Sequence, residues 1–197
     1  MSELTAIIIL AAGNSSRLGE PKQLLRYKNK TLLENTIAAA ASAVPNSVII
    51  VVTGANHELI QKELYTESVI ICYNPDWENG MSTSINAGLK KLLTLHPDIQ
   101  KCIFTVCDQP YLSDAVFEDL LKEYFKTKKG IIASSYSQTL GTPVLFDKKY
   151  FDALFELKGQ EGAKKIITQF AEDTTSVLFE KGAVDIDTVE DYNNLIN

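Results

Sequence analysis

Short, fully apolar runs rich in β-branched residues recur along the chain, and longer amphipathic stretches separate them. Residues 6–10 read Ala-Ile-Ile-Ile-Leu, and residues 48–52 read Val-Ile-Ile-Val-Val. A strand without polar alternation is typical of a sheet that is covered on both faces. Because strands that alternate with helices form parallel βαβ units, the sequence predicts an α/β fold. We expect a Rossmann-like three-layer sandwich with a mainly parallel, mixed sheet, in a single domain over residues 1–197.

The expected elements follow from apolar periodicity and from capping and turn residues. Thr31 and Glu34 have the spacing of a capping box, which predicts a helix over 31–43. Thr188 is expected to open the last helix, with Asp187 as the alternative cap. The other helices are expected at 56–65, 82–95, 113–126, 149–157 and 162–170. Strands are expected at 6–10, 48–52, 69–73, 103–107, 131–133, 143–146, 177–179 and 184–186.

The composition excludes several classes of protein. The chain has 197 residues, with 19 Lys and Arg against 25 Asp and Glu, so its formal net charge is −6. This balance argues against nucleic-acid binding, because the phosphate backbone requires clustered Lys and Arg. No apolar run approaches the ~20 residues of a membrane span, and three Cys without CxxC spacing indicate buried, reduced thiols. We expect a cytoplasmic protein with neither nucleic-acid nor membrane partners.

The loop after the first strand has the composition of a phosphate-binding loop. Gly13 lets a ligand approach the main chain, and successive backbone N–H groups can form a nest for phosphate oxygens. Ser15 adds a hydroxyl donor, while Arg17 and Lys22 add two cations. The P-loop and the dinucleotide fingerprint are both absent, since their glycine spacings do not occur here. A solvated turn with stray charges is the alternative interpretation.

This loop also carries a family resemblance. The run Leu10-Ala-Ala-Gly-x-Ser-x-Arg-x-Gly-x-Pro-Lys22 resembles the signature loop of nucleotidyltransferases that activate a phosphorylated acceptor with an NTP. It is most similar to the molybdenum-cofactor nucleotidyltransferases, the cytidylyltransferase branch in particular. The resemblance implies a nucleotidyltransferase, glycosyltransferase-A-like fold in which this loop wraps the triphosphate and two of its side chains are catalytic, Arg17 and Lys22. The nucleotide-binding residues that it implies here are Leu10, Ala11, Ala12, Gly13, Ser15, Arg17 and Lys22.

A second segment of the resemblance, residues 74–88, follows the third strand and enters a helix. Hydroxyls and free N–H groups at a helix N-terminus favour anions, although ordinary helix capping is the favoured interpretation of this segment taken alone. The family places a similar stretch at the nucleotide and acceptor pocket. We therefore add Gly80, Ser82 and Ser84 to the expected nucleotide-binding residues. Trp77 is expected either to stack on a ring of the ligand or to anchor the loop.

Two acidic segments complete the resemblance. Asp108 ends the fourth strand in Asp-Gln-Pro, and the family uses this aspartate to bind the catalytic metal, so it is expected to be catalytic and a ligand of Mg²⁺. Mg²⁺ prefers one or two carboxylates together with ligand phosphates. Asp185, near the C-terminus, is favoured as the second ligand, with Asp187 as the alternative. In a strand, both of these carboxylates would point the same way.

Two positions depart from the family pattern. Thr142 stands where the family often has His, and Gln160 stands where it has an acid, for which Glu161 is the possible substitute. The resemblance implies CTP as the nucleotide, a molybdopterin form of the molybdenum cofactor as the acceptor, and a molybdoenzyme as a partner. The alternatives are a sugar- or alcohol-phosphate nucleotidyltransferase and a non-catalytic cofactor-binding chaperone. An oxidoreductase of the Rossmann type ranks behind these, because its fingerprint is missing.

Overall fold

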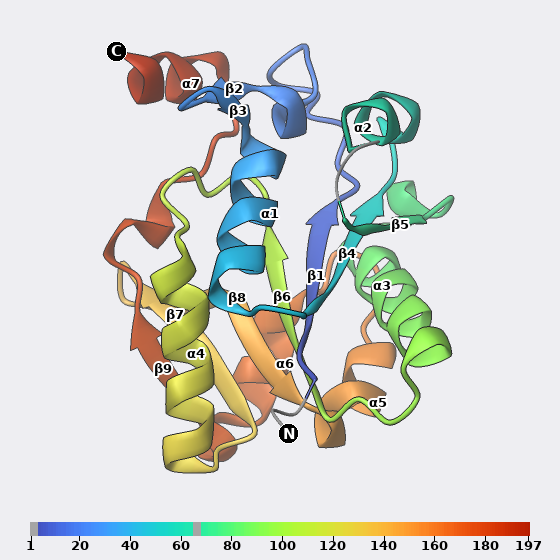
Figure 1. Cartoon of the computed structure of the whole chain (residues 1–197), viewed down its shortest axis with the longest axis vertical. Coiled ribbons are helices and arrows are strands. Elements are labelled where there is room, and N and C mark those ends of the chain that lie inside the picture. Colours follow the sequence, from blue (N-terminus) through green and yellow to red (C-terminus); the bar gives the residue numbers. More distant parts are fainter. Residues whose placement is uncertain (1–3, 65–67) are drawn as a thin grey trace.

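The computed structural model describes residues 4–64 and 68–197, and it contains one large sheet at its centre (Figure 1). In this sheet β8 runs antiparallel to its neighbours β6 and β7, and the other neighbouring strands pair in parallel. The expected mixed, mainly parallel sheet is therefore confirmed. Its seven strands lie in the order β5 (Ile70–Tyr73), β4 (Val48–Thr53), β1 (Ala6–Ala11), β6 (Lys101–Val106), β8 (Thr139–Asp147), β7 (Ile131–Tyr136) and β9 (Thr174–Leu178).

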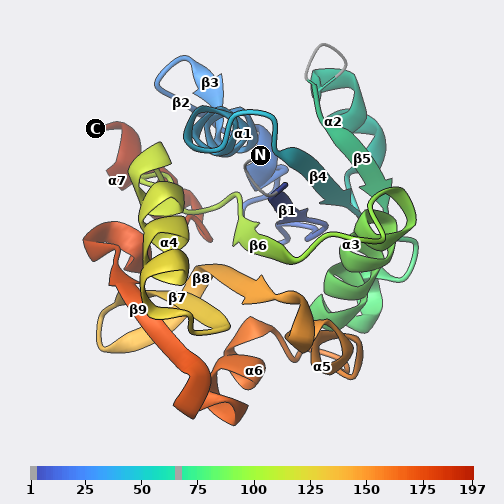
Figure 2. The same ribbon diagram turned by 60° about the horizontal axis from the view of Figure 1, so that its bottom comes forward.

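Helices cover both faces of the sheet, which confirms the three-layer sandwich. Figure 2 shows α1 and α4 on one side of the sheet and α5 and α6 on the other. The first side consists of α1 (Leu32–Ala43), α2 (His57–Glu63) and α4 (Asp114–Thr127). The second side consists of α3 (Met81–Leu95), α5 (Phe151–Phe155) and α6 (Ala163–Gln169). A last helix, α7 (Val189–Ile196), lies at the end of the molecule where β1 and β6 terminate.

The continuous apolar strands are explained by this double coverage. In β1, Ile7 and Ile9 pack into the core beneath α1, whereas Ala6 and Ile8 pack into the core beneath α3. All four residues are completely buried. Because successive side chains of a strand point to opposite faces, a strand between two cores needs apolar residues at every position.

The capping box predicted for α1 is present, and α7 begins with a second one. At the start of α1, the Thr31 hydroxyl accepts a hydrogen bond from Glu34 N at 3.1 Å, and the Glu34 carboxylate accepts one from Thr31 N at 2.6 Å. At the start of α7, Thr188 and Asp191 form the equivalent pair. Thr188 is therefore the cap of α7, which settles the choice between Thr188 and Asp187.

The structure corrects the predicted elements in three places. Residues 184–186 form no strand. They are linked to the loop after β6 by one hydrogen bond, from Ile186 N to the Asp108 carbonyl at 3.0 Å, and one such bond does not make a strand pairing. The expected loop between 133 and 143 is a hairpin, in which β7 and β8 continue to a turn at residues 137 and 138, both with positive φ. A second, unpredicted hairpin joins β2 (Arg26–Tyr27) to β3 (Lys30–Thr31).

Short 3₁₀ segments account for most of the smaller differences. They include η1 (Lys22–Leu24), η3 (Trp77–Asn79), η4 (Lys148–Tyr150), η5 (Ala171–Asp173) and η6 (Glu180–Ala183). The helix expected at 149–157 consists of η4 followed by α5, and the one expected at 56–65 ends at Glu63, with Tyr65 outside the described residues. Within the described ranges, no helix has the length and apolar character needed to cross a membrane.

Helix α3 lies against β1 and β4 through Gly88, where an added Cβ would come within 2.6 Å of Ile8 Cγ2 and 2.8 Å of Val52 Cγ2. Glycine to alanine in a helix is normally stabilising. We expect Gly88→Ala to destabilise this protein instead, by about 1–3 kcal/mol, because the methyl group overpacks the core. Urea unfolding measures the change. Lys90→Ala, at an exposed position of the same helix, is the control, and a gain in stability for Gly88→Ala would contradict the packing.

Candidate functional site

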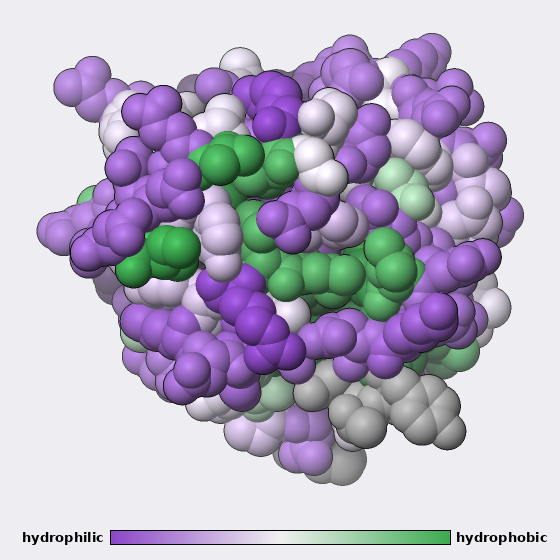
Figure 3. Space-filling model, turned by 90° about the horizontal axis from the view of Figure 1, so that it is seen from above, coloured by the Kyte–Doolittle hydropathy of each residue, from purple (hydrophilic) through white to green (hydrophobic). Residues whose placement is uncertain are grey.

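A cleft lies at the carboxyl ends of β1 and β6, at the upper end of the molecule in Figure 1. Figure 3 looks onto this end and shows apolar surface in a hollow surrounded by hydrophilic side chains. The cleft has a volume of about 350 Å³. It brings together three segments that the sequence singled out. Its lining consists of Leu10, Ala12, Gly13, Asn14, Lys22, Trp77, Glu78, Gly80, Met81, Ser84, Val106, Asp108 and Gln160.

The predicted site residues divide into two groups in the structure. Those that line the cleft are Leu10, Ala12, Gly13, Lys22, Gly80, Ser84 and Asp108. Those that do not line it are Ala11, Ser15, Arg17, Ser82 and Asp185. Of the second group, Ala11 and Ser82 are buried behind the cleft, whereas Arg17 and Asp185 are exposed beside it.

The first loop is held in shape by a residue that the sequence analysis did not identify. The Gln23 side chain is 1% exposed, and its amide nitrogen donates to the carbonyls of Ala11 and Gly13, both at 2.9 Å. Ser15 has a positive φ of 55°, and its hydroxyl accepts a hydrogen bond from Lys22 N at 2.9 Å. Ser15 therefore closes the loop on itself. The sequence shows only an amide residue directly after Lys22, and nothing in it indicates that the side chain is buried.

Lys22 joins the loop to both acidic segments. Its ammonium lies 2.5 Å from Asp108 Oδ2 and 2.9 Å from Asp187 Oδ1, and Arg17 lies 2.9 Å from Asp187 Oδ2. Burial opposes the charge of Lys22, but the attraction of Asp108 and hydrogen bonds to both carboxylates outweigh burial and raise the pKa of Lys22. The same hydrogen bond, aided by Arg17, lowers the pKa of Asp187. Both groups are therefore charged at neutral pH.

Asp185 has the opposite electrostatic situation. Although its side chain is exposed, the protein around it and the negative charges of Asp108 and Asp187 raise its pKa to about 6. None of the ion pairs formed within residues 4–64 and 68–197 includes Asp185. Ile186, between the two aspartates, is completely buried, so both carboxylates project away from the core although the segment is not a strand. The site thus holds an uncompensated negative charge next to Asp108.

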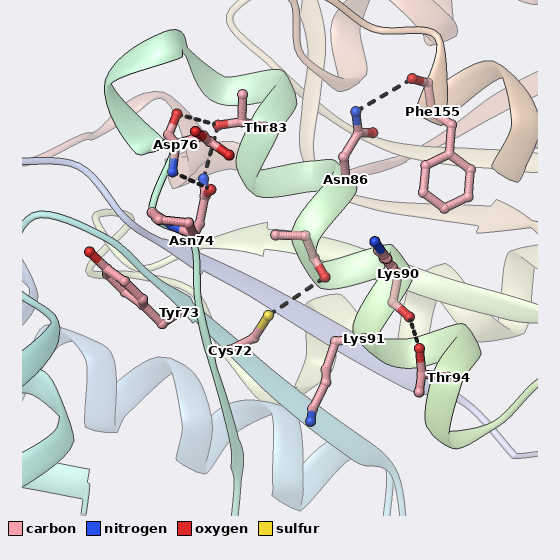
Figure 4. Close-up of a pocket in the computed structure, with 12 residues that line it drawn as sticks. Cys72, Tyr73, Asn74, Asp76, Thr83, Asn86, Lys90, Lys91, Thr94 and Phe155 are labelled. Carbon is pink, nitrogen blue, oxygen red and sulfur yellow. Dashed lines mark hydrogen bonds between the residues drawn. The ribbon is translucent and has the colours of Figure 1, made fainter.

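The second segment, between β5 and α3, is organised by Asn74. This residue is 2% exposed, and its side-chain nitrogen donates to Thr83 Oγ1 at 2.9 Å (Figure 4). The same nitrogen also donates to Ser84 Oγ at 3.0 Å. It therefore orients a hydroxyl that lines the cleft. The sequence analysis quoted Asn74 only as part of a motif. Ser82, by contrast, donates its N–H to the Gly159 carbonyl at 3.1 Å, so this helix N–H already has a partner.

Trp77 serves as an anchor and also lines the cleft. Gly54 lies so close beneath it that an added Cβ would come within 2.7 Å of Trp77 Cβ and 2.5 Å of the Ala12 carbonyl.

The two positions that depart from the family pattern lie in different parts of the structure. Gln160 lines the cleft, whereas Glu161 does not line it and pairs with Lys165 at 2.7 Å. Thr142 lies in β8 and is not among the residues that line the cleft.

Other features of the described chain lie apart from this site. Burial raises the pKa values of all three cysteine thiols, that of Cys107 to about 12, which makes them poor nucleophiles. A groove of about 630 Å³ lies between β5 and α3 (Figure 4), and one of about 690 Å³ lies between β8, β9 and α6. Neither groove shares a lining residue with the cleft.

The fold and the cleft define an α/β nucleotidyltransferase. The chain belongs to the family described as MobA-like NTP transferase domain, which matches residues 7–174. It is 29% identical to the molybdenum cofactor cytidylyltransferase of Escherichia coli (strain K12), over 94% of this chain and 92% of that protein. It is also 29% identical to the nicotine blue oxidoreductase of Paenarthrobacter nicotinovorans, over 96% of this chain and 95% of that protein.

Solved structures share this fold. The crystal structure of Rv0371c from Mycobacterium tuberculosis H37Rv has a TM-score of 0.85 and 25% identity, and the similarity covers 99% of this chain and 98% of that one. A nucleotidyl transferase from Methanothermobacter shares the fold, with a TM-score of 0.81 and 20% identity over 98% and 95% of the two chains. The family and the fold together confirm that this chain is a nucleotidyltransferase.

Removal of the Gln23 amide leaves two loop carbonyls without their donor. Because an unsatisfied buried polar group costs about 1–3 kcal/mol, we expect Gln23→Ala to lower the free energy of unfolding by about 2–3 kcal/mol. Urea denaturation measures the loss. Gln61→Ala, at an exposed position of α2, is the control and should stay within about 0.5 kcal/mol of the wild type. Equal stability of the two variants would show that Gln23 does not support the loop.

The raised pKa of Asp185 predicts a pH dependence of stability. Because the folded protein binds this proton more tightly than the unfolded chain, the stabilising effect of protonation is complete below the unfolded pKa of 3.8 and is lost as pH rises through about 6. We expect Asp185→Asn to raise Tm at pH 7.5 without metal by about 2 °C, since exposed charges contribute below about 1 kcal/mol. The difference should shrink between pH 7 and pH 4.5. A constant difference in thermal scans would contradict it.

Proposed function

We propose that this protein is a Mg²⁺-dependent cytidylyltransferase that transfers CMP from CTP to a phosphorylated acceptor, a molybdopterin form of the molybdenum cofactor, and releases pyrophosphate. The observation that carries the proposal is the cleft itself, where Lys22 joins the glycine-containing loop to Asp108. The choice of nucleotide and acceptor is supported by the name of the Escherichia coli relative. We also propose that residues 1–197 act as one domain, in the cytoplasm, and deliver the product to a molybdoenzyme.

The residues of the cleft suit nucleotidyl transfer. An oxygen of the acceptor phosphate forms a bond to the α-phosphorus of the NTP, and the bond to the pyrophosphate oxygen breaks. The attacking oxygen is already anionic, so no protein base is needed, and no histidine is among the residues that line the cleft. Lys22 and Arg17 would neutralise the leaving pyrophosphate, while the backbone at Leu10 and Gly13 would position the nucleotide. Catalysis would then consist of positioning and charge stabilisation.

The donor set fits a magnesium ion. Asp108 Oδ1 is buried and has no hydrogen-bond partner, and Asp185 is an uncompensated carboxylate nearby. Among the described residues, no group of three or more His, Cys, Asp or Glu is placed to hold a metal by itself. This pattern agrees with Mg²⁺, which takes one or two carboxylates and completes its shell with substrate phosphates and water. Asp108 and Asp185 would hold the ion, whose charge would stabilise the phosphates during transfer.

A redox function is the second candidate, because one relative is named an oxidoreductase. A non-catalytic cofactor-binding chaperone and a sugar-phosphate nucleotidyltransferase also remain alternatives. Pyrophosphate release, measured with each of the four NTPs and with molybdopterin or sugar phosphates as acceptors, separates them. Release with CTP and molybdopterin alone supports the proposal. Tight binding of a ligand without turnover favours the chaperone. No pyrophosphate release with any pair of NTP and acceptor would contradict each of the proposed transferase functions.

We expect Asp108→Asn and Lys22→Ala each to reduce Mg²⁺-dependent pyrophosphate release by at least about 100-fold, because each removes a preorganised charge from the reacting phosphates. The far-UV circular dichroism spectrum should remain that of the wild type. Asp119→Asn and Lys30→Ala make the same charge changes at exposed positions outside the cleft, and they serve as matched controls. Full activity in both Asp108→Asn and Lys22→Ala would disprove the assignment of the site.

A further inference from the structure

The ammonium of Lys22 lies among the carboxylates that the proposed function assigns to a divalent cation. We propose that Lys22 acts as a resident cation of this site, so that the metal binds weakly to the free enzyme and strongly only together with the nucleotide. This inference rests on the proposed function for the identity of the ligand. Its physical basis is the placement of Lys22, Asp108 and Asp187, which holds independently of the base or acceptor.

Lys22 neutralises part of the negative charge of the site. Asp108, Asp185 and Asp187 contribute three negative charges to one end of the cleft, and Lys22 contacts two of them, at 2.5 Å and 2.9 Å. The Lys22 side chain is 18% exposed and that of Asp108 is 17% exposed, so water screens their interaction poorly. An ammonium in this position supplies part of the neutralisation that a metal ion would otherwise supply.

A divalent cation and the ammonium cannot both bind Asp108 closely without strong repulsion. Mg²⁺ binds a carboxylate oxygen at about 2.0–2.1 Å, and the two oxygens of Asp108 are so close together that the ion would lie within a few ångströms of the ammonium. At such separations, in a partly buried site, like charges repel strongly. The orphaned Asp108 Oδ1 is therefore available to a metal only when Lys22 has moved away.

The loop is built so that the side chain can move while its backbone stays. Lys22 N is fixed by Ser15 Oγ, and the neighbouring Gln23 is buried and bonded to two carbonyls. The four-carbon side chain of Lys22 is flexible, and Lys22 lines the cleft. Triphosphate in the cleft offers the ammonium stronger anions than Asp108. Nucleotide binding would thus vacate Asp108, and by linkage the metal would strengthen nucleotide binding to the same extent.

The test measures Mn²⁺ binding by electron paramagnetic resonance, in the absence of any nucleotide. We expect Lys22→Met to bind Mn²⁺ at least 10-fold more tightly than the wild type. Lys30→Met changes the net charge equally at an exposed position outside the cleft, and it should bind Mn²⁺ as the wild type does. The double variant Lys22→Met with Asp108→Asn should lose the added affinity, which assigns the gain to this site.

Two measurements keep the inference testable if Lys22→Met does not fold. Lys22→Gln removes the charge with a polar side chain of similar length, and the wild type itself should gain Mn²⁺ affinity when a non-hydrolysable CTP analogue is added. Equal Mn²⁺ affinity of the wild type and the folded Lys22 variants, or no Mn²⁺ binding to either, would overturn the inference. The comparison of the wild type with the Lys22 variants uses no nucleotide or acceptor. It can therefore support the inference even if the protein does not transfer cytidylyl groups, and it can overturn the inference even if the protein does.

Discussion

The burial of the central strands on both faces is the constraint from which the site follows. β1 and β6 are parallel neighbours, and β1 carries only apolar side chains that are buried along most of its length. Polar chemistry is therefore confined to the loops at the strand ends. Because parallel strands end at the same edge, the loop after β1 and Asp108 after β6 meet there. The same geometry places the glycine-containing entry to α3 beside them.

Like charges at that edge are tolerated because cations from the first loop lie between them. Three aspartates converge there, and burial together with the negative charges of Asp108 and Asp187 raises the pKa of Asp185. Asp108 Oδ1 is buried without a hydrogen-bond partner, so the negative charge of this carboxylate is also incompletely neutralised. Such incomplete neutralisation is characteristic of functional sites, where stability is given up for a ligand that completes the charge balance. In this enzyme the ligand would be a cation bound to phosphate.

Sequence reasoning succeeded where one local signal determined the outcome. The capping box at Thr31 and Glu34 fixed the start of α1, and the first loop identified Lys22 because a motif is contiguous in the chain. It failed where partners are distant. The segment 184–186 has the composition of a strand, but its backbone bond to the sheet region goes to the Asp108 carbonyl, in the loop after β6 and far away in sequence. Gln23 and Asn74 were missed because a buried amide is recognised as an organiser only once its carbonyl and hydroxyl partners are placed.

The sequence by itself determined the fold class, the family and the identities of the charged side chains, because apolar periodicity and a contiguous motif are local properties of the chain. Tertiary structure alone decided how those charges are paired. Nothing in the spacing of Lys22, Asp108 and Asp187 indicates that one ammonium contacts both carboxylates, since the two contacts join residues that are 86 and 165 positions apart in the chain. It also decided that Gln160 lines the cleft while Glu161 does not. Pairing depends on distance in space, which only the packing of the sheet and its helices sets.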